Sequence, residues 1–147
     1  MSEDNIENRF MIQKIFTKNI SFESPNSPSI FTESWNPDLN LNLTFKQNEL
    51  DEDTYEVILM ITAQVTNNEK TAFVVEVEQA GIFTIQGTEA EQLNIALGAF
   101  CPSILYPYIR EIITSEVARG GFPQLVLEPL NFDAIYFQRQ KEKELES

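Results

Sequence analysis

The stretch Asp38-Leu39-Asn40-Leu41-Asn42-Leu43-Thr44-Phe45-Lys46 decides the fold. Every second residue is large and apolar, and the residues between them are polar or charged. Successive side chains of a β-strand point to opposite faces, so this alternation places all the apolar groups on one face. Residues 38–46 are therefore predicted to form a strand with one face in the core and one in water.

Three neighbouring segments repeat this alternation. Residues 54–66 carry a row of apolar side chains at odd positions: Tyr55, Val57, Leu59, Ile61 and Val65. Residues 71–86 follow the polar turn Asn67-Asn68-Glu69-Lys70 and carry a similar row: Phe73, Val75, Val77, Phe83 and Ile85. Residues 9–23 carry theirs at even positions: Phe10, Ile12, Phe16, Ile20 and Phe22. Four such strands predict an antiparallel sheet, in which Gly81 is interpreted as a bulge.

The second half of the chain changes to a helical period. Thr88-Glu89-Ala90-Glu91 fits a capping box at the start of a short helix that runs toward Gly98. Pro102 and Pro107 fall near the beginning of a second helix, which Gly120-Gly121 ends after Arg119. Its apolar stripe comprises Ile104, Leu105, Tyr108, Ile109, Ile112, Ile113 and Val117.

A last helix is predicted after an extended segment, residues 122–129. Asn131 can cap it, and Phe132, Ile135 and Tyr136 are its apolar residues. From about residue 140 the chain is a charged tail that we expect to fray. The fold class is α+β: a four-stranded antiparallel sheet with helices packed on one face, in a single domain over residues 1–147.

Composition and charge restrict the possible partners. The 147 residues contain 23 Asp and Glu against 10 Lys and Arg, which gives a formal net charge of -13. Because phosphate binding depends on Lys and Arg, nucleic acid is an improbable partner, and a locally basic protein is favoured. The apolar runs are too short for a signal peptide or a membrane span. We expect a soluble protein of the cytoplasm.

The chain has few of the residues that enzymes use for catalysis. The chain has no His and one cysteine, Cys101, which excludes Cys/His zinc sites, His-dependent triads and a disulfide within one chain. Cys101 is interpreted as a small buried hydrophobic residue. No glycine-rich phosphate loop occurs. A carboxylate pair, Glu76 with Glu78 or Asp51 with Asp53, leaves a hydrolase as an alternative, but the sequence favours a non-enzymatic protein without metal or cofactor.

Two features suggest interaction surfaces. The proline-rich segment of residues 24–37 carries Phe31 and Trp35, which either line a binding groove or cover the edge of the core. The even-numbered face of the predicted sheet mixes apolar and acidic residues: Ile58, Met60, Val74, Ala80 and Ile82 beside Glu56, Glu76 and Glu78. Such a face either packs against another subunit or carries scattered exposed apolar residues.

Several separate strings resemble one known family. They are Lys18-Asn19-Ile20-Ser21-Phe22-Glu23-Ser24-Pro25-Asn26, Gly81-Ile82-Phe83, Leu97-Gly98-Ala99-Phe100-Cys101-Pro102-Ser103-Ile104-Leu105-Tyr106-Pro107-Tyr108, Arg119-Gly120-Gly121-Phe122-Pro123-Gln124-Leu125 and Asn131-Phe132-Asp133. In this order, over nearly the whole chain, they resemble the SecB family of bacterial export chaperones. The resemblance implies a homotetramer, a dimer of dimers, that holds unfolded secretory precursors without ATP and delivers them to the translocation ATPase SecA.

The resemblance also implies site residues. The client groove corresponds to Phe31, Trp35, Leu41, Leu43 and Leu127. The SecA-binding positions correspond to Asn19, Glu23, Val74 and Glu76, where Asn19 departs from the aspartate usual in the family. The interface between dimers corresponds to Val75, Val77 and Gln79. The alternative hypothesis is an acidic oligomeric adaptor or scaffold without chaperone activity.

Overall fold

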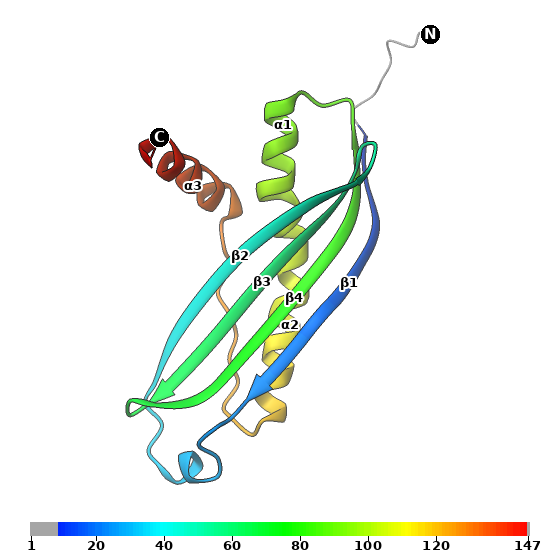
Figure 1. Ribbon diagram of the computed structural model, residues 1–147. Helices are drawn as coiled ribbons and strands as arrows, with labels where there is room; N and C mark the ends of the chain where they lie inside the picture. Colours follow the sequence, from blue (N-terminus) through cyan, green and yellow to red (C-terminus); the bar gives the residue numbers. More distant parts are fainter. Residues whose placement is uncertain (1–8, 147) are drawn as a thin grey trace.

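A single antiparallel sheet forms one layer of the molecule (Figure 1). The computed structural model describes residues 9–146. The four strands are β1 (Arg9–Glu23), β2 (Pro37–Asp51), β3 (Thr54–Asn67) and β4 (Lys70–Gln86). Their order in the sheet is β1-β4-β3-β2, and all neighbours are antiparallel. The predicted four-stranded sheet is confirmed, and β1 and β2 are its two edges.

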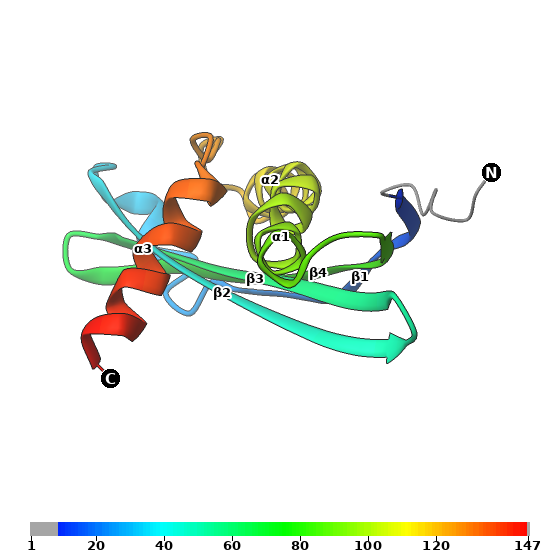
Figure 2. The same cartoon turned by 90° about the horizontal axis from the view of Figure 1, so that it is seen from above.

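One long helical rod packs on one face of the sheet, as Figure 2 shows from above. A continuous helical rod contains α1 (Ala90–Ile95), a π-helical turn η2 (Ala96–Phe100) and α2 (Cys101–Arg119). An extended segment then leads to α3 (Phe132–Glu146), which stands on the β2 side of α2. A short 3₁₀ helix, η1 (Ser29–Thr32), interrupts the β1–β2 connection. In the part of the chain described, no helix is long and apolar enough to cross a membrane.

The core lies between the odd-numbered face of β3 and β4 and one stripe of α2. Register pairs such as Ile61 with Val77 and Leu59 with Gln79 place these residues on the same face, which we call the helix-facing face. The stripe of α2 that meets them is fully buried: Leu105, Ile109, Ile113 and Val117. Each buried aliphatic side chain contributes about 1.5–3 kcal/mol. Tyr108, predicted to belong to this stripe, is instead 47% exposed at its margin.

Two bulges in β1 correct the predicted alternation of that strand. Phe10 pairs with Ile85 and Phe22 with Val75, both on the helix-facing face, but Phe16 pairs with Ala80 on the opposite, outer face. The register shifts fall between Ile12 and Lys14 and between Thr17 and Asn19. Each extra residue reverses the facing of those that follow, because the side-chain period of a strand is 2. A single even-numbered apolar face on β1 is therefore wrong.

Gly81 does not mark a bulge. It keeps its register opposite both Ile15 and Val57, and the chain there makes a close approach instead. A Cβ atom at this position would lie 2.7 Å from Cε2 of Phe83 and 3.3 Å from Cδ2 of Leu105. The missing side chain makes room for the Phe83 ring beneath α2.

The helix ends differ in part from the prediction. The N-cap of α1 is Glu89 and makes no side-chain capping bond, so the capping box at Thr88 is wrong. Pro102 lies in the first turn of α2, as predicted, whereas Pro107 lies inside the helix. Two other predicted signals, the glycine that follows α2 and the asparagine cap of α3, are confirmed. Gly121, with φ of 90°, follows α2, and the Asn131 side chain accepts a bond from the Ala134 amide at 3.0 Å. Helix α3 continues to Glu146, where a frayed tail was predicted.

Candidate functional site

The loop between β1 and β2 is anchored to the turn between β3 and β4. Asn67, whose side chain is fully buried, accepts a hydrogen bond from the Asn36 amide at 2.5 Å and donates one to the Ser34 carbonyl at 2.9 Å. On the other limb of the loop, the Asn26 side chain donates to the carbonyl of Thr71 at 2.9 Å. These bonds hold a loop that has little regular structure of its own.

An ion pair strengthens the same anchor. Lys70 Nζ lies 2.7 Å from Glu33 Oε2, and the Asn68 side chain donates to the other carboxylate oxygen of Glu33 at 3.2 Å. The hydrogen bond from Lys70 and then that from Asn68 hold the pKa of Glu33 below its ordinary value. Because that pKa is lowered in the folded state, the contribution is present near neutral pH and is lost as acid protonates the carboxylate.

Phe31 and Trp35 share a hydrophobic support on the buried Phe122. The ring centroids of Phe31 and Phe122 are 4.8 Å apart, and those of Trp35 and Phe122 are 5.9 Å apart. Phe31 remains 48% exposed and Trp35 38% exposed. One side of each ring therefore covers the edge of the core, and the other side faces solvent.

Leu41 and Leu43 lie on the helix-facing face of the edge strand β2. They pair with Ala63 and Ile61, are half-buried, and pack against the core. Leu127 is only 2% exposed and belongs to that core. The Tyr106 hydroxyl donates to the Glu128 carbonyl at 2.5 Å and fixes the extended segment that carries Leu127. Four of the five predicted client residues thus present accessible surface, and Leu127 is buried in the core.

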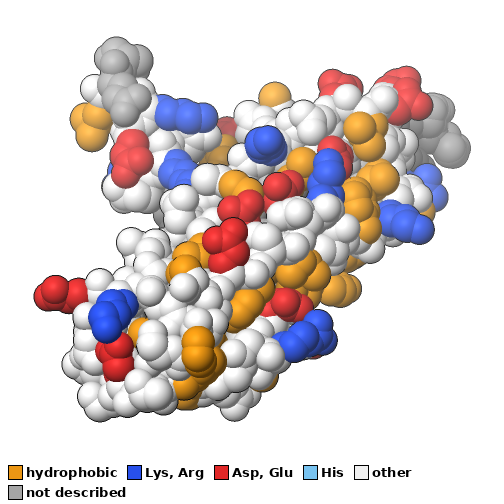
Figure 3. Space-filling model, turned by 60° about the horizontal axis from the view of Figure 1, so that its bottom comes forward, with side chains coloured by type: hydrophobic (Ala, Val, Ile, Leu, Met, Phe, Trp, Pro, Cys, Tyr) orange, Lys and Arg blue, Asp and Glu red, His pale blue; other side chains and the backbone are white. Residues whose placement is uncertain are grey.

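The predicted SecA-binding positions come together on the outer face of the sheet. Glu23 pairs with Val74, and Ser21 pairs with Glu76. Asn19 lies opposite Glu78, which extends the acidic group. Asn19 and Glu23 are exposed, whereas Val74 and Glu76 are half-buried. Figure 3 views the molecule with the loop end brought forward, and apolar and acidic side chains alternate across this face.

The three predicted dimer-interface residues lie on the opposite, helix-facing face. Val75 and Val77 have no exposed surface, and Gln79 is 3% exposed beneath α2. The Thr17 hydroxyl donates to Gln79 Oε1 at 2.7 Å. In a single chain these side chains are therefore almost completely covered.

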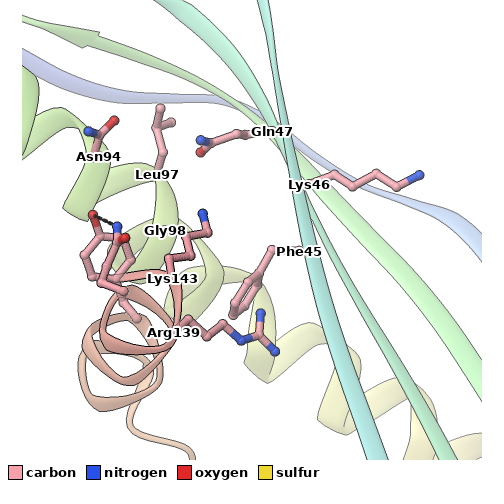
Figure 4. A pocket seen from close by; sticks show the side chains of 10 residues that line it. Phe45, Lys46, Gln47, Asn94, Leu97, Gly98, Arg139 and Lys143 are labelled. Atoms are coloured by element: carbon pink, nitrogen blue, oxygen red, sulfur yellow. Dashed lines mark hydrogen bonds between the residues drawn. The ribbon is translucent and has the colours of Figure 1, made fainter. Parts of the chain in front are cut away.

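A cavity that sequence reasoning missed lies between β2, η2 and α3 (Figure 4). Its volume is about 440 Å³. The lining residues are Phe45, Lys46, Gln47, Asn94, Leu97, Gly98, Tyr136, Arg139, Gln140 and Lys143. No sequence pattern pointed to it, because its walls come from three distant parts of the chain: β2, the rod of α1 and η2, and α3. The only usable signal was Arg139 and Lys143, one turn apart in an otherwise acidic protein.

Among the described residues, no group of three or more His, Cys, Asp or Glu side chains is placed to hold a metal ion. Cys101 is fully buried, which confirms its interpretation as a hydrophobic core residue. Burial raises the pKa of its thiol to about 12, so the reactive thiolate is strongly disfavoured.

Known proteins share both the sequence and the fold. Residues 3–143 match the family described as preprotein translocase subunit SecB. Protein-export protein SecB of Legionella pneumophila strain Philadelphia 1 is 55% identical over 143 residues, which cover 97% of this chain and 88% of the relative. The strain Corby protein of the same name is 54% identical, with the same coverage of 97% and 88%.

A solved structure has a similar fold at low sequence identity. It is a SecB-like chaperone of Mycobacterium tuberculosis in complex with an antitoxin peptide, with a TM-score of 0.69 and 21% identity. The match covers 83% of this chain and 91% of that chain. At this identity the likeness concerns the fold alone.

Proposed function

Because the chain belongs to the SecB family and is a protein-export chaperone of the Sec pathway, we propose that it captures unfolded secretory precursors through a groove beside β2 and transfers them to SecA. The family is non-enzymatic. The observation that carries the proposal is the pair of half-exposed rings, Phe31 and Trp35, on an anchored loop. We place this activity in the cytoplasm, where a single unpaired cysteine is stable.

The proposed groove combines the two rings with Leu41 and Leu43 on the edge strand. Rigid aromatic side chains bring a large apolar area at a small cost in side-chain entropy. Each apolar client residue buried there gains about 1.5–3 kcal/mol. Apolar contacts of this kind discriminate only weakly between client sequences, so the groove accepts many clients.

Capture then acts by mass action. A protein that binds the unfolded state and not the native state draws the folding equilibrium toward the unfolded chain. Clients that fold fast escape, and slow-folding precursors are retained. The sequence has no phosphate-binding loop, which is consistent with a mechanism that needs no nucleotide.

The outer face of the sheet is the proposed docking site for a basic segment of SecA. Glu23 and Glu76 lie on adjacent strands, with Glu78 next along the same face, and Val74 contributes an apolar contact. Individual exposed charge pairs add about 0–1 kcal/mol, but several together accelerate association and fix its direction.

We further propose that the chain assembles as a dimer of dimers. Apolar side chains beside α2 and on the helix-facing side of β1 remain open to solvent: Ile12 at 47%, Ile20 at 44%, Phe100 at 51% and Tyr108 at 47%. A second copy of the chain would bury these exposed apolar side chains. The role implied for Val75, Val77 and Gln79 is then indirect, since they position α2 from beneath.

The test measures aggregation of a chemically unfolded precursor without nucleotide. The parent protein should suppress aggregation, and the double variant Phe31→Ala/Trp35→Ala should lose most of this effect while its thermal midpoint moves little. Leu145→Ala, at a site 86% exposed on α3, is the control and should behave like the parent. A parent protein that leaves aggregation unchanged would support an acidic adaptor instead.

A further inference from the structure

The cross-strand pair of Asn19 and Glu78 lies on the outer face of the sheet, inside the proposed SecA dock. Asn19 of β1 stands directly opposite Glu78 of β4. Asn19 is exposed and Glu78 is half-buried. Residues that face each other in an antiparallel pair have Cβ atoms about 4.5–5.5 Å apart. A carboxylate at either position therefore lies within about 5 Å of the place that the other position would give it.

One residue of this pair carries a charge and the other does not. Two carboxylates directly opposite each other repel and destabilise a sheet. An amide at position 19 avoids that repulsion with Glu78, whereas an aspartate there, the residue usual in the family, would introduce it. The pair thus keeps a single carboxylate, which stands on β4 and not on β1.

The carboxylate of Glu78 is open to a partner. Lys18, the bulge residue that precedes Asn19, is engaged by Glu56, with Nζ 3.0 Å from Oε2. The other ion pairs of residues 9–146 lie elsewhere, and within that range Glu78 forms neither an ion pair nor a side-chain hydrogen bond. Its negative charge is therefore left for a cation that the partner supplies.

A small hollow borders Glu78 on the side of β3. Its volume is about 90 Å³, and Ile58 and Met60 line it from β3. Lys46 borders it from β2, at a distance that makes no ion pair with Glu78. A cavity of about 150 Å³ holds a benzene molecule, so this hollow has room for a few non-hydrogen atoms. The aliphatic stem of a Lys or Arg side chain can lie there while its cationic end reaches Glu78.

We infer that Glu78 and this hollow hold one Lys or Arg side chain of the basic segment of SecA, and that Glu78 thereby performs the role of the carboxylate that Asn19 lacks. This role rests on the proposed SecA dock, since Glu78 acts there only if the basic segment binds the outer face. Glu76 lies two residues away on the same strand, about 7 Å at the rise of a strand. The two carboxylates on β4 can therefore bind two cations of one segment.

Calorimetry with a synthetic peptide of the basic segment tests this role in four proteins: the parent, Glu78→Gln, Asn19→Asp and the exchange variant Asn19→Asp/Glu78→Gln. Glu78→Gln should weaken binding about twofold to fivefold at low ionic strength, as expected for one partly exposed charge pair. The exchange variant should recover most of the lost affinity, because its carboxylate returns within reach of a flexible basic side chain. Added salt should reduce these differences.

One control and a second measurement separate this role from a general effect of charge. Glu91→Gln makes the same substitution on an exposed residue of α1 and should keep the parent affinity. Thermal unfolding needs no partner. Asn19→Asp should lower the thermal midpoint, because two carboxylates then face each other, and the exchange variant should regain the parent midpoint.

The outcomes distinguish the role of Glu78 from the dock itself. Parent-like affinity in Glu78→Gln, together with weaker binding in Glu76→Lys, would overturn the role of Glu78 and leave the dock in place. Weaker binding in Glu78→Gln that the exchange variant does not recover would also overturn it, because Glu78 would not then replace a carboxylate at position 19. A parent protein that does not bind the peptide would instead count against the dock.

Discussion

The buried side chain of Asn67 accepts a hydrogen bond from the backbone amide of Asn36 at 2.5 Å, which ties the end of β3 to the loop that carries Trp35. The same side chain donates to Ser34, so one residue satisfies two backbone groups of the loop. An unpaired buried polar group costs about 1–3 kcal/mol, so loss of this contact should lower the free energy of unfolding by a measurable amount.

Asn67→Ala should loosen the loop and weaken client capture. The single Trp reports on the loop, so its fluorescence anisotropy should fall, and the free energy of unfolding should decrease by about 1–3 kcal/mol. Asn40→Ala, at an exposed position on β2, is the control. Unchanged Trp mobility in Asn67→Ala would show that the loop is held by other contacts.

Val77→Arg should prevent stable folding and not merely separate subunits. Val77 has no exposed surface, and an unpaired charge buried there costs several kcal/mol, comparable with the total stability of a domain. Circular dichroism and a melting curve measure the loss. A folded Val77→Arg protein that is only smaller by native mass spectrometry would place Val77 in the interface itself.

Tyr108→Arg should change assembly without unfolding the chain. The side chain is 47% exposed on α2, so a charge there stays hydrated in one chain but is buried by a second copy. Native mass spectrometry should show smaller assemblies than for the parent protein. Gln138→Arg, at an exposed position on α3, adds the same charge and should leave the parent mass, whereas identical masses for Tyr108→Arg would reject this surface.

Glu76→Lys should weaken binding of the basic segment of SecA, most strongly at low ionic strength, because exposed charges are screened by salt. Asn19→Asp should strengthen it by restoring a carboxylate opposite Glu78. Calorimetry with a peptide of that basic segment measures both affinities, and Glu91→Lys on α1 is the matched charge control. Client capture should be intact in all three variants. If neither Glu76→Lys nor Asn19→Asp alters the affinity, the outer face is not the dock.

Cys101 should be unreactive in the native protein at pH 8. Its pKa is raised to about 12 by burial, so the thiol stays protonated there, whereas an unfolded cysteine near pKa 8.5 is partly ionised. Reaction with an aromatic disulfide reagent should be about a thousandfold slower than in denaturant. Fast native labelling would mean that the rod between η2 and α2 opens readily.

Much of the fold was predictable because local pattern and tertiary structure agree. The odd-numbered residues of β3 and β4 are the core, as their alternation predicts, and Asn131 and Gly121 end elements as their chemistry requires. The errors have a common cause. The reversal at Phe16 and the close packing at Gly81 depend on the neighbouring strand and on α2, which no local pattern contains.

The sequence by itself determined the number and type of strands, the apolar face of the sheet and the family, because side-chain periodicity and linear motifs are properties of adjacent residues. Tertiary structure alone decided that Val77 lies under α2, that Asn67 anchors the Trp35 loop and that Arg139 lies over the Phe45 ring. Residues 67 and 36, or 139 and 45, are distant in the chain. Their contacts exist only because strand pairing and helix packing bring the elements together, and a buried polar group or charge is favourable only when that packing supplies its partner.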